Sequence, residues 1–462
     1  MDAAAELVGT LADEGVQHLF INPGTDTAPV QEALAAARKD GAPSPRAVLC
    51  THEFVALSAA MGHYFASGTP QAVMVHVDAG TLNLGGALHN AQRNRVPAVI
   101  FAGRSPYATS PGIPGHRDTY IHWQQEQLDQ QAVVRAFGKW TMEVPRGRDL
   151  GLIVRRAYQV ARADPRGLAY VMLPREALMD PAGGGPARRL PPPAPAAADP
   201  ATLAEMARCL ADADRPVIVT SRTGARPAAV AALVEVAEIL GCPVLDHRDR
   251  LSFPPGHPLY AGESGEVLTD ADVVLILDTE VPWIPVHAAP PPDAIVLEEA
   301  VTNRPAVLRQ IAREPGGYYA TGSPALGWAV AGAMGVKLAR PQAPVIAICG
   351  DGAFSFSVPT AAIWSAQRAG APFVAVILNN RAYRASRLPV QRLYPGGAAD
   401  AEGSFPETDL DPAPSFVDLA RAYGGDGRVV RGPEELPAAL DYCLGLEADG
   451  RCGVVDIQLP RG

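Results

Sequence analysis

The stretch Val345-Ile346-Ala347-Ile348-Cys349-Gly350-Asp351-Gly352 decides the fold of this chain. Its first five residues are apolar, and a short apolar run that ends at a glycine predicts a buried strand. Gly350 and Gly352 allow the backbone to turn sharply and to approach a ligand closely, and Asp351 offers a carboxylate there. Because ligands bind outside the carboxyl ends of the strands in open parallel sheets, the stretch predicts a parallel α/β fold and a ligand site.

A second buried strand, predicted over Phe373–Leu378, ends in Asn379-Asn380. Two adjacent strand ends then supply a carboxylate oxygen from Asp351 and an amide oxygen from Asn380. Such hard oxygen ligands suit Mg²⁺, which takes one or two protein oxygens and completes its octahedron with water and phosphate. Each motif alone is also typical of an ordinary turn. Together, with 26 residues between Gly352 and Asn379, they indicate a metal site.

The rest of the sequence predicts three units and a linker. Residues 1–180 alternate strand patterns with amphipathic helix patterns, which is typical of a parallel sheet. Residues 181–200 are rich in glycine and proline and predict a surface linker. Residues 201–292 predict a smaller α/β unit, and residues 293–462 repeat the strand and helix order of the first unit. The predicted strands are Val16–Asn22, Ala72–His76, Ala98–Phe101, Ala169–Met172, Val217–Val219, Val244–Leu245, Val273–Leu277, Ala294–Leu297, Val345–Cys349, Val374–Leu378 and Val454–Ile457, and the predicted helices are Phe54–Phe65, Leu150–Ala163, Leu203–Ala211, Ala228–Leu240, Leu326–Leu338 and Thr360–Ala369.

Composition excludes several classes of function. The formal net charge is −10 at pH 7, which argues against nucleic acid or an anionic membrane as a partner. No apolar run approaches the ~20 residues of a membrane span, and the N-terminal stretch has no basic signal region, so we expect a cytoplasmic protein. The six cysteines are scattered without metal-ligand spacing, which predicts reduced thiols.

The pair of motifs around Asp351 and Asn380 resembles the signature of the thiamine-diphosphate enzymes. This resemblance implies two doubly wound parallel-sheet domains, one for the pyrimidine and one for the diphosphate of the cofactor, which flank an α/β middle domain. It also implies that Asp351, the side chain of Asn380 and the backbone oxygen of Ala382 bind Mg²⁺, which in turn holds the diphosphate.

The same resemblance implies further residues beside the diphosphate. Gly350, Gly352 and the backbone N–H of Ala353 are candidates, although Ala353 stands where the family often has serine. The loop that contains Thr302 and Asn303 matches a second diphosphate loop of the family. An ordinary capping loop is an equally good interpretation of those two residues.

Activation of thiamine requires a carboxylic acid that hydrogen-bonds the aminopyrimidine ring of the cofactor. Glu53 fits this role, because a short strand over 47–50 delivers it to the start of an apolar helix. An acid favoured by the helix dipole is the alternative interpretation. Leu326 matches the large aliphatic residue on which the family bends the cofactor, and a core leucine at a helix start is its alternative.

Two stretches resemble benzoylformate decarboxylases: NPGT at residues 22–25 and HVDAGTLN at residues 76–83. By this resemblance, Thr25 binds the substrate carboxylate and His76 moves protons to or from the substrate. A histidine titrates near neutral pH and therefore suits this work. A strand-end histidine that only bonds the backbone is the alternative for His76.

Other residues match the broader pattern of acetolactate synthases. Gly80 and Asn83 belong to this pattern, and so does HWQQE at residues 122–126, where the family has a glutamine that faces the cofactor. Gln125 is the candidate for that glutamine. The middle unit is short and lacks the segment that handles FAD in those enzymes, so we do not expect FAD.

The resemblance predicts an enzyme that uses thiamine diphosphate and Mg²⁺ on a 2-oxo acid. The overall pattern favours carboligation of the acetolactate synthase kind, whereas Thr25 and His76 favour non-oxidative decarboxylation of the benzoylformate decarboxylase kind. A thiamine-diphosphate-binding protein with little activity of its own is the third hypothesis, because the middle unit is shortened. In the family, two subunits share each active site, so we expect a homodimer or homotetramer.

Overall fold

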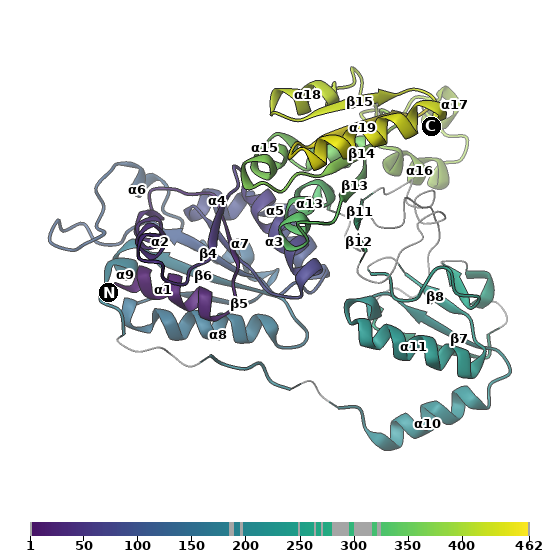
Figure 1. Cartoon of the computed structure of the whole chain (residues 1–462), viewed down its shortest axis with the longest axis horizontal. Coiled ribbons are helices and arrows are strands. Elements are labelled where there is room, and N and C mark those ends of the chain that lie inside the picture. The colour runs from purple at the N-terminus through teal and green to yellow at the C-terminus, as the bar shows by residue number, and fades with distance from the viewer. Residues whose placement is uncertain are drawn as a thin grey trace. The chain divides into compact units, whose positions relative to one another are not determined.

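The computed structural model contains three parallel sheets (Figure 1). It describes residues 2–183, 189–194, 197–247, 250–262, 265–268, 271–279, 295–299, 317–320 and 325–460. Two compact units form. The first consists of Met1–Pro195, Ser323–Pro341 and Thr360–Ala371, and the second consists of the remainder.

The first sheet belongs to the first unit and has six parallel strands in the order β2-β1-β3-β4-β6-β5. Alternate strand residues face opposite sides of the sheet, so Leu19 and Ile21 pack in one core with helices α1 and α8, which lie along one side in Figure 1. The strands are β1 (His18–Ile21), β2 (Arg46–Leu49), β3 (Ala72–Val75), β4 (Val99–Arg104), β5 (Gly138–Glu143) and β6 (Leu168–Pro174). The helices are α1 (Ala3–Asp13), α2 (Ala28–Asp40), α3 (Glu53–Ser67), α4 (Val77–Asn83), α5 (Gly85–Arg93), α6 (Ile121–Gln124), α7 (Ala132–Arg135), α8 (Leu150–Arg162) and α9 (Arg175–Met179).

The second unit holds the other two sheets. A four-stranded sheet has the order β10-β7-β8-β9, and a six-stranded sheet has the order β12-β11-β13-β14-β16-β15. Their strands are β7 (Pro216–Thr220), β8 (Val244–Asp246), β9 (Tyr260–Gly262), β10 (Val273–Leu277), β11 (Ile295–Glu299), β12 (Tyr318–Ala320), β13 (Val345–Gly350), β14 (Val374–Asn379), β15 (Asp426–Val430) and β16 (Gly453–Gln458). The described helices from residue 200 on, of which α13 and most of α15 belong to the first unit, are α10 (Pro200–Ala211), α11 (Pro227–Leu240), α13 (Trp328–Ala339), α14 (Asp351–Phe356), α15 (Pro359–Ala369), α16 (Arg384–Leu393), α17 (Ala398–Glu402), α18 (Phe416–Ala422) and α19 (Leu436–Ala448).

The two six-stranded sheets share one topology. Numbered by their order along the chain, the strands of each sheet run 2-1-3-4-6-5. The strand order therefore reverses direction between the first and third strands, which are β1 and β3 in one sheet and β11 and β13 in the other. Ligands of open parallel sheets bind at the carboxyl ends of the strands at such a reversal. The α/β prediction is confirmed, and the predicted domain boundaries at residues 180, 200 and 292 remain predictions.

Most expected elements form within a few residues of their predicted ends, but some were not predicted. Strands β5 and β15 lie at sheet edges, where half-buried strands carry polar residues and lose the continuous apolar pattern. The helix expected from Leu326 begins at Trp328, which leaves Leu326 in the preceding bend. Among the described helices, none combines the length and apolarity that a membrane crossing requires.

Helices α3 and α13, both in the first unit, approach each other at backbone distance. A Cβ atom on Gly335 would overlap the backbone of Ala59, and one on Gly62 would overlap the backbone of Gly332. The rings of Phe65 and Trp328 pack beside this crossing, with centroids 5.5 Å apart. The crossing anchors the helix that begins with Glu53.

Two histidines predict that the first unit is sensitive to acid: His63 is buried and His18 is half-buried. The rings of His18 in β1 and His63 in α3 lie 5.1 Å apart. Burial lowers the pKa of His18 to about 4, helped by the charge of Arg46, and lowers the pKa of His63 to about 3, helped by His18. Both values lie below the ordinary ~6.5, so the unfolded chain binds more protons than the folded chain. The stability that neutral histidines contribute is present above pH 6.5 and is lost as the pH falls toward the folded-state pKa values.

We expect the free energy of unfolding to fall by up to about 2 kcal/mol for each of these histidines between pH 7.5 and pH 5. Urea unfolding at the two pH values measures the change. A His63→Gln variant, whose side chain has no charge to gain, should lose less stability over the same interval than the wild type. A His116→Gln variant in an exposed loop is the matched control and should follow the wild type. If the free energy of unfolding fell equally in the wild type and in His63→Gln between the two pH values, the prediction would be contradicted.

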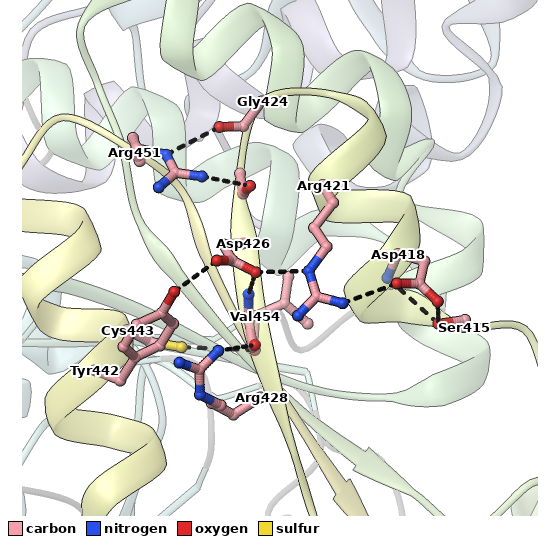
Figure 2. A network of polar contacts seen from close by, with 12 residues as sticks. Ser415, Asp418, Arg421, Gly424, Asp426, Arg428, Tyr442, Cys443, Arg451 and Val454 are labelled. Carbon is pink, nitrogen blue, oxygen red and sulfur yellow. Dashed lines mark hydrogen bonds and ion pairs between the residues drawn. The ribbon is translucent and has the colours of Figure 1, made fainter.

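Figure 2 shows a polar network that joins α18, β15 and α19. The Asp426 carboxylate accepts hydrogen bonds from Arg421 Nε at 2.8 Å and from the Tyr442 hydroxyl at 2.5 Å. The guanidinium of Arg428 lies 3.5 Å from the centroid of the Tyr442 ring. The Tyr442 hydrogen bond, followed by that of Arg421, holds the pKa of Asp426 well below its usual range. Asp426 stands at the amino end of β15, away from the ligand edge of the sheet, so the network stabilises an edge strand.

Candidate active site

Two groups of residues, each containing predicted site residues, stand at carboxyl ends of strands, one in each compact unit. In the first unit they follow β1, β2 and β3, and in the second unit they follow β13 and β14. Both places adjoin the reversal of strand order. We call the first group the glutamate cluster, made of Asn22, Glu53, Gly80 and Asn83, with His76 and its neighbours beside it. We call the second group the aspartate loop, made of Asp351, Gly352, Asn380, Arg381 and Ala382.

The glutamate cluster is held by two amide side chains. Glu53 is the first residue of α3 and is buried. Its Oε1 accepts a hydrogen bond from Asn22 Nδ2 at 2.9 Å, and its Oε2 accepts one from Asn83 Nδ2 at 3.1 Å. A Cβ atom on Gly80 would lie 3.0 Å from Glu53 Oε1, so a larger residue at position 80 would press on the carboxylate. The structure thus brings Glu53, Gly80 and Asn83 together.

His76 stands between β3 and α4, where it is the N-cap residue of α4. Its Nδ1 forms a hydrogen bond with Oδ1 of Asp26, which is buried. This hydrogen bond is the main cause that raises the pKa of His76, and burial of the ring opposes it. Val77, the next residue, has φ 27°, a left-handed conformation that β-branched residues rarely adopt. The backbone after His76 is therefore strained, which is common at functional sites.

Gln125 and Thr25 differ in how they lie relative to His76. Gln125 is buried at the C-terminal end of α6, and a hydrogen bond with its side chain adds to the rise of the His76 pKa. Thr25 is exposed in the turn between β1 and α2. Asp26, its neighbour in that turn, is the residue that contacts His76.

Sequence reasoning missed Asn22 and Asp26. Asn22 belongs to the NPGT stretch that was singled out for Thr25, and its contact with Glu53 spans 31 positions of sequence. Asp26 follows the same stretch, and its partner His76 lies 50 positions away. The only sequence signal is position: Asn22 ends a predicted strand, and Asp26 lies in the loop that follows it.

The aspartate loop brings together the ends of β13 and β14, which pair in register with Gly350 opposite Leu378. Asp351 Oδ1 accepts a hydrogen bond from the backbone N–H of Gly352 at 3.0 Å, and Asn380 Oδ1 accepts one from that of Ala382 at 3.2 Å. Burial raises the pKa of Asp351, and backbone hydrogen bonds from Gly352, Arg381 and Ala382 oppose the rise. These N–H groups belong to both loops, so Asp351 and the segment around Asn380 are neighbours.

Asp351 Oδ2 is buried and has no hydrogen-bond partner among the described residues. A buried carboxylate oxygen without a partner costs free energy, which a bound cation would offset. The nearby oxygens come from a carboxylate, an amide and backbone carbonyl groups, which are hard donors of the kind that Mg²⁺ takes. The donor set of the aspartate loop therefore fits a magnesium ion.

The other predicted cofactor residues lie as follows. Gly350 precedes α14, and no described atom lies within 4 Å of the position that a Cβ on it would take. Gly352 packs against the ring of Tyr383, and Ala353 is buried. Leu326 is half-buried in the first compact unit, where the carbonyl of its neighbour Ala325 accepts a hydrogen bond from Asn90 at 3.0 Å. Thr302 and Asn303 lie outside the described residues.

Three family models match the chain. The N-terminal TPP binding domain of the thiamine pyrophosphate enzymes matches residues 1–133, the central domain matches residues 203–298, and the C-terminal TPP binding domain matches residues 303–457. Together they contain both groups of site residues.

Two named relatives match over most of their length. A benzoylformate decarboxylase of Pseudomonas aeruginosa is 27% identical, with 94% of this chain and 95% of that protein covered. An acetolactate synthase large subunit of Mycobacterium tuberculosis is 25% identical, with 88% and 87% covered. Among solved structures, a thiamine diphosphate-dependent 4-hydroxybenzoylformate decarboxylase of Rhodococcus jostii has a TM-score of 0.82 at 22% identity, with 100% of both chains covered. That structural likeness shows the fold.

The alignment with the Pseudomonas relative spans 531 positions, which exceeds the 462 residues of this chain. The relative therefore contains segments for which this chain has no counterpart. The shortened middle domain remains a prediction.

Proposed function

Because the chain belongs to the thiamine pyrophosphate enzymes, we propose that it uses thiamine diphosphate and Mg²⁺ to remove CO₂ from a 2-oxo acid and then protonates the product. The observation that carries this proposal is the histidine at the end of β3, whose Nδ1 is held by a buried carboxylate and whose pKa is raised. A raised pKa favours the protonated ring, which can donate a proton to a carbon that has lost CO₂. The name of the Pseudomonas relative supports an aryl 2-oxo acid as a first substrate to test.

When bound, thiamine diphosphate supplies the carbon nucleophile and the electron sink that cleavage beside a carbonyl requires. Asp351, Asn380 and the backbone oxygen of Ala382 would hold Mg²⁺, with Gly350, Gly352 and Ala353 beside the diphosphate. Thr302 and Asn303 remain candidates for a further diphosphate contact. Leu326 remains the candidate support for the bent cofactor.

The chain's own side chains would do the proton work. Glu53 would hydrogen-bond the aminopyrimidine ring and hold the proton that this ring exchanges. His76 would protonate the product, and Thr25 would bind the substrate carboxylate. Gln125, which is buried beside His76, would face the cofactor and the substrate.

We further propose that the glutamate cluster of one subunit and the aspartate loop of a second subunit complete each site. A homodimer would then be the smallest active form, and a homotetramer would be two such dimers. Gel filtration of the active enzyme tests this, because an active monomer would contradict it.

Carboligation is the second candidate function. Gly80 and Asn83, which the structure places at the Glu53 carboxylate, match the acetolactate synthase pattern, and the relative from Mycobacterium tuberculosis carries that name. In this case the product carbon attacks a second carbonyl group before any proton arrives.

Incubation with benzoylformate and with pyruvate, each with thiamine diphosphate and Mg²⁺, separates the two functions. We expect CO₂ and one equivalent of aldehyde from benzoylformate, because the raised pKa of His76 favours a proton-donating ring. Acetolactate or an acyloin as the main product would favour carboligation. The absence of CO₂ from both acids would contradict both substrate assignments. Cofactor binding without turnover, measured by circular dichroism, would then favour a binding protein without activity of its own.

A further inference from the structure

Three buried polar atoms near His76 have no hydrogen-bond partner among the described residues. They are Oδ2 of Asp26, Oδ1 of Asp78 and Nε2 of Gln125. Buried polar groups are normally paired, so three such atoms around one ring mark a place where solvent or a ligand completes the bonding. Asp26 and Asp78 are also the two acids whose charges act on His76.

Two glycines make room for the contact between Asp26 and His76. A Cβ atom on Gly103 in β4 would overlap the Asp26 carboxylate, and one on Gly24 would overlap the His76 ring. Any other residue at these positions would push the acid and the ring apart. Neither glycine has a positive φ. Glycine is therefore needed at these positions because it leaves space, and not because of its backbone conformation.

The acid and the ring differ in exposure. The Asp26 side chain is 2% exposed, whereas that of His76 is 27% exposed. The acid therefore lies behind the ring with Nδ1 toward it, and Nε2 is the ring nitrogen that Asp26 does not hold. A buried carboxylate cannot be solvated by water, so its charge acts strongly on a neighbouring imidazole.

We propose that Asp26 is a positioning residue that orients His76 through Nδ1 and keeps it protonated, so that Nε2 serves as the proton donor of the reaction. This inference rests on the proposed decarboxylation, which gives the donor its task. In one turnover, Nε2 passes one proton to the substrate carbon that has lost CO₂, the imidazolium becomes neutral imidazole, and one proton from water restores it. No oxidant or reductant is needed.

The charges around the pair support this role. Asp26 in the loop after β1 and Asp78 in α4 both favour the protonated ring, and Gln125 adds a hydrogen bond. His122 of α6 also lies within reach of the Asp26 charge, but burial and the charge of Arg175 lower its pKa. The pKa of His76 is thus raised and that of His122 is lowered, although the Asp26 charge acts on both rings.

Histidine NMR of the full-length enzyme, with thiamine diphosphate and Mg²⁺ present, tests the proposal without substrate. The ¹³Cε1 resonance of His76 is identified by its loss in a His76→Gln variant. We expect His76 of the wild type to titrate above the ordinary ~6.5, and in Asp26→Asn to titrate about one to three units lower. An unchanged titration in Asp26→Asn overturns the proposal.

Asp78→Asn is the matched control, because it removes the same charge from a buried acid that does not bond the ring. The pKa of His76 should fall less in Asp78→Asn than in Asp26→Asn. An equal fall in both variants overturns the specific role of Asp26. Gly103→Ala is a second, independent variant that keeps both partners but crowds the carboxylate. It should also lower the His76 titration, and it keeps the proposal testable if Asp26→Asn does not fold.

Kinetics then connect the pair to the reaction. The basic limb of the kcat profile for decarboxylation should move down by the same number of units in Asp26→Asn, with KM little changed. If the His76 titration moves in Asp26→Asn but the basic limb of the kcat profile does not, the positioning role is overturned. If the wild type decarboxylates no 2-oxo acid, the proposed function fails, while the NMR experiment still decides whether Asp26 controls His76. The two failures are therefore distinguishable.

Discussion

Replacement of Glu53 by glutamine is expected to lower kcat by about 10²- to 10⁴-fold and to leave cofactor binding largely intact. The substitution removes the acid that would hold the proton for the aminopyrimidine ring and changes no residue of the aspartate loop. Steady-state turnover, together with a titration of thiamine diphosphate, measures both effects. A Glu53→Gln enzyme with full activity would contradict the assignment.

The local contacts of Glu53 require a control. Its carboxylate accepts one hydrogen bond on each oxygen, from Asn22 and from Asn83. A glutamine offers only one acceptor, so one asparagine would lose its partner at a cost of about 1–3 kcal/mol of stability. Asn83→Ala removes one of these donors and keeps the acid. If Asn83→Ala loses as much kcat as Glu53→Gln, the loss reflects a disturbed cluster and not the missing acid.

A second control addresses buried acids in general. Glu176→Gln alters another buried glutamate of the first unit, which accepts a hydrogen bond from the backbone N–H of Ala108 at 2.8 Å. This residue has no place in the proposed chemistry. The kcat of Glu176→Gln should stay close to that of the wild type. Circular dichroism verifies that the variant is folded.

Replacement of Asp351 by asparagine is expected to weaken Mg²⁺-dependent binding of thiamine diphosphate by about 100-fold or more. The change keeps the shape of the side chain but removes the only carboxylate of the aspartate loop. Loss of one partner from a buried charge pair costs about 3–5 kcal/mol, which corresponds to roughly 10²-fold or more in affinity. Quenching of tryptophan fluorescence on cofactor addition, with Mg²⁺ and with a chelator, measures the effect.

The matched control for this variant is Asp246→Asn. Asp246 is also a buried aspartate at the carboxyl end of a parallel strand, β8, and accepts hydrogen bonds from the backbone of Ser252 and Phe253. It lies in the four-stranded sheet, outside the aspartate loop. Cofactor affinity should be unchanged in Asp246→Asn. Equal affinity in wild type and Asp351→Asn would refute the magnesium assignment.

Those parts of the fold that depend on local pattern could be predicted from the sequence. Apolar runs predicted the buried strands β13 and β14, because every residue of such a strand faces a core and must be apolar. The edge strands β5 and β15 were not predicted, because they are half-buried and their polar residues interrupt that pattern. The helix that begins with Glu53 was predicted within a few residues, since apolar residues dominate it for several turns.

For the candidate site too, the sequence predicted individual residues but not their contacts. Short motifs identified Asp351, Asn380, Glu53 and His76, because each stands directly after a strand or at the start of a helix, and such positions are visible in a few neighbouring residues. What surrounds those residues was not visible. The Asn22 contact with Glu53 and the Asp26 contact with His76 join positions 31 and 50 residues apart.

The sequence by itself determined that the stretch from Val345 to Gly352 ends a buried strand with a carboxylate between two glycines. Periodicity and loop composition are properties of a few consecutive residues, so they suffice for that conclusion. Only the tertiary structure decided that both six-stranded sheets run in the order 2-1-3-4-6-5 and reverse beside the candidate site. Strand order depends on which distant strands pair, and that choice is made by packing over the whole sheet. The partners of Glu53 and His76 follow from this order, because it brings the ends of β2, β1 and β3 side by side.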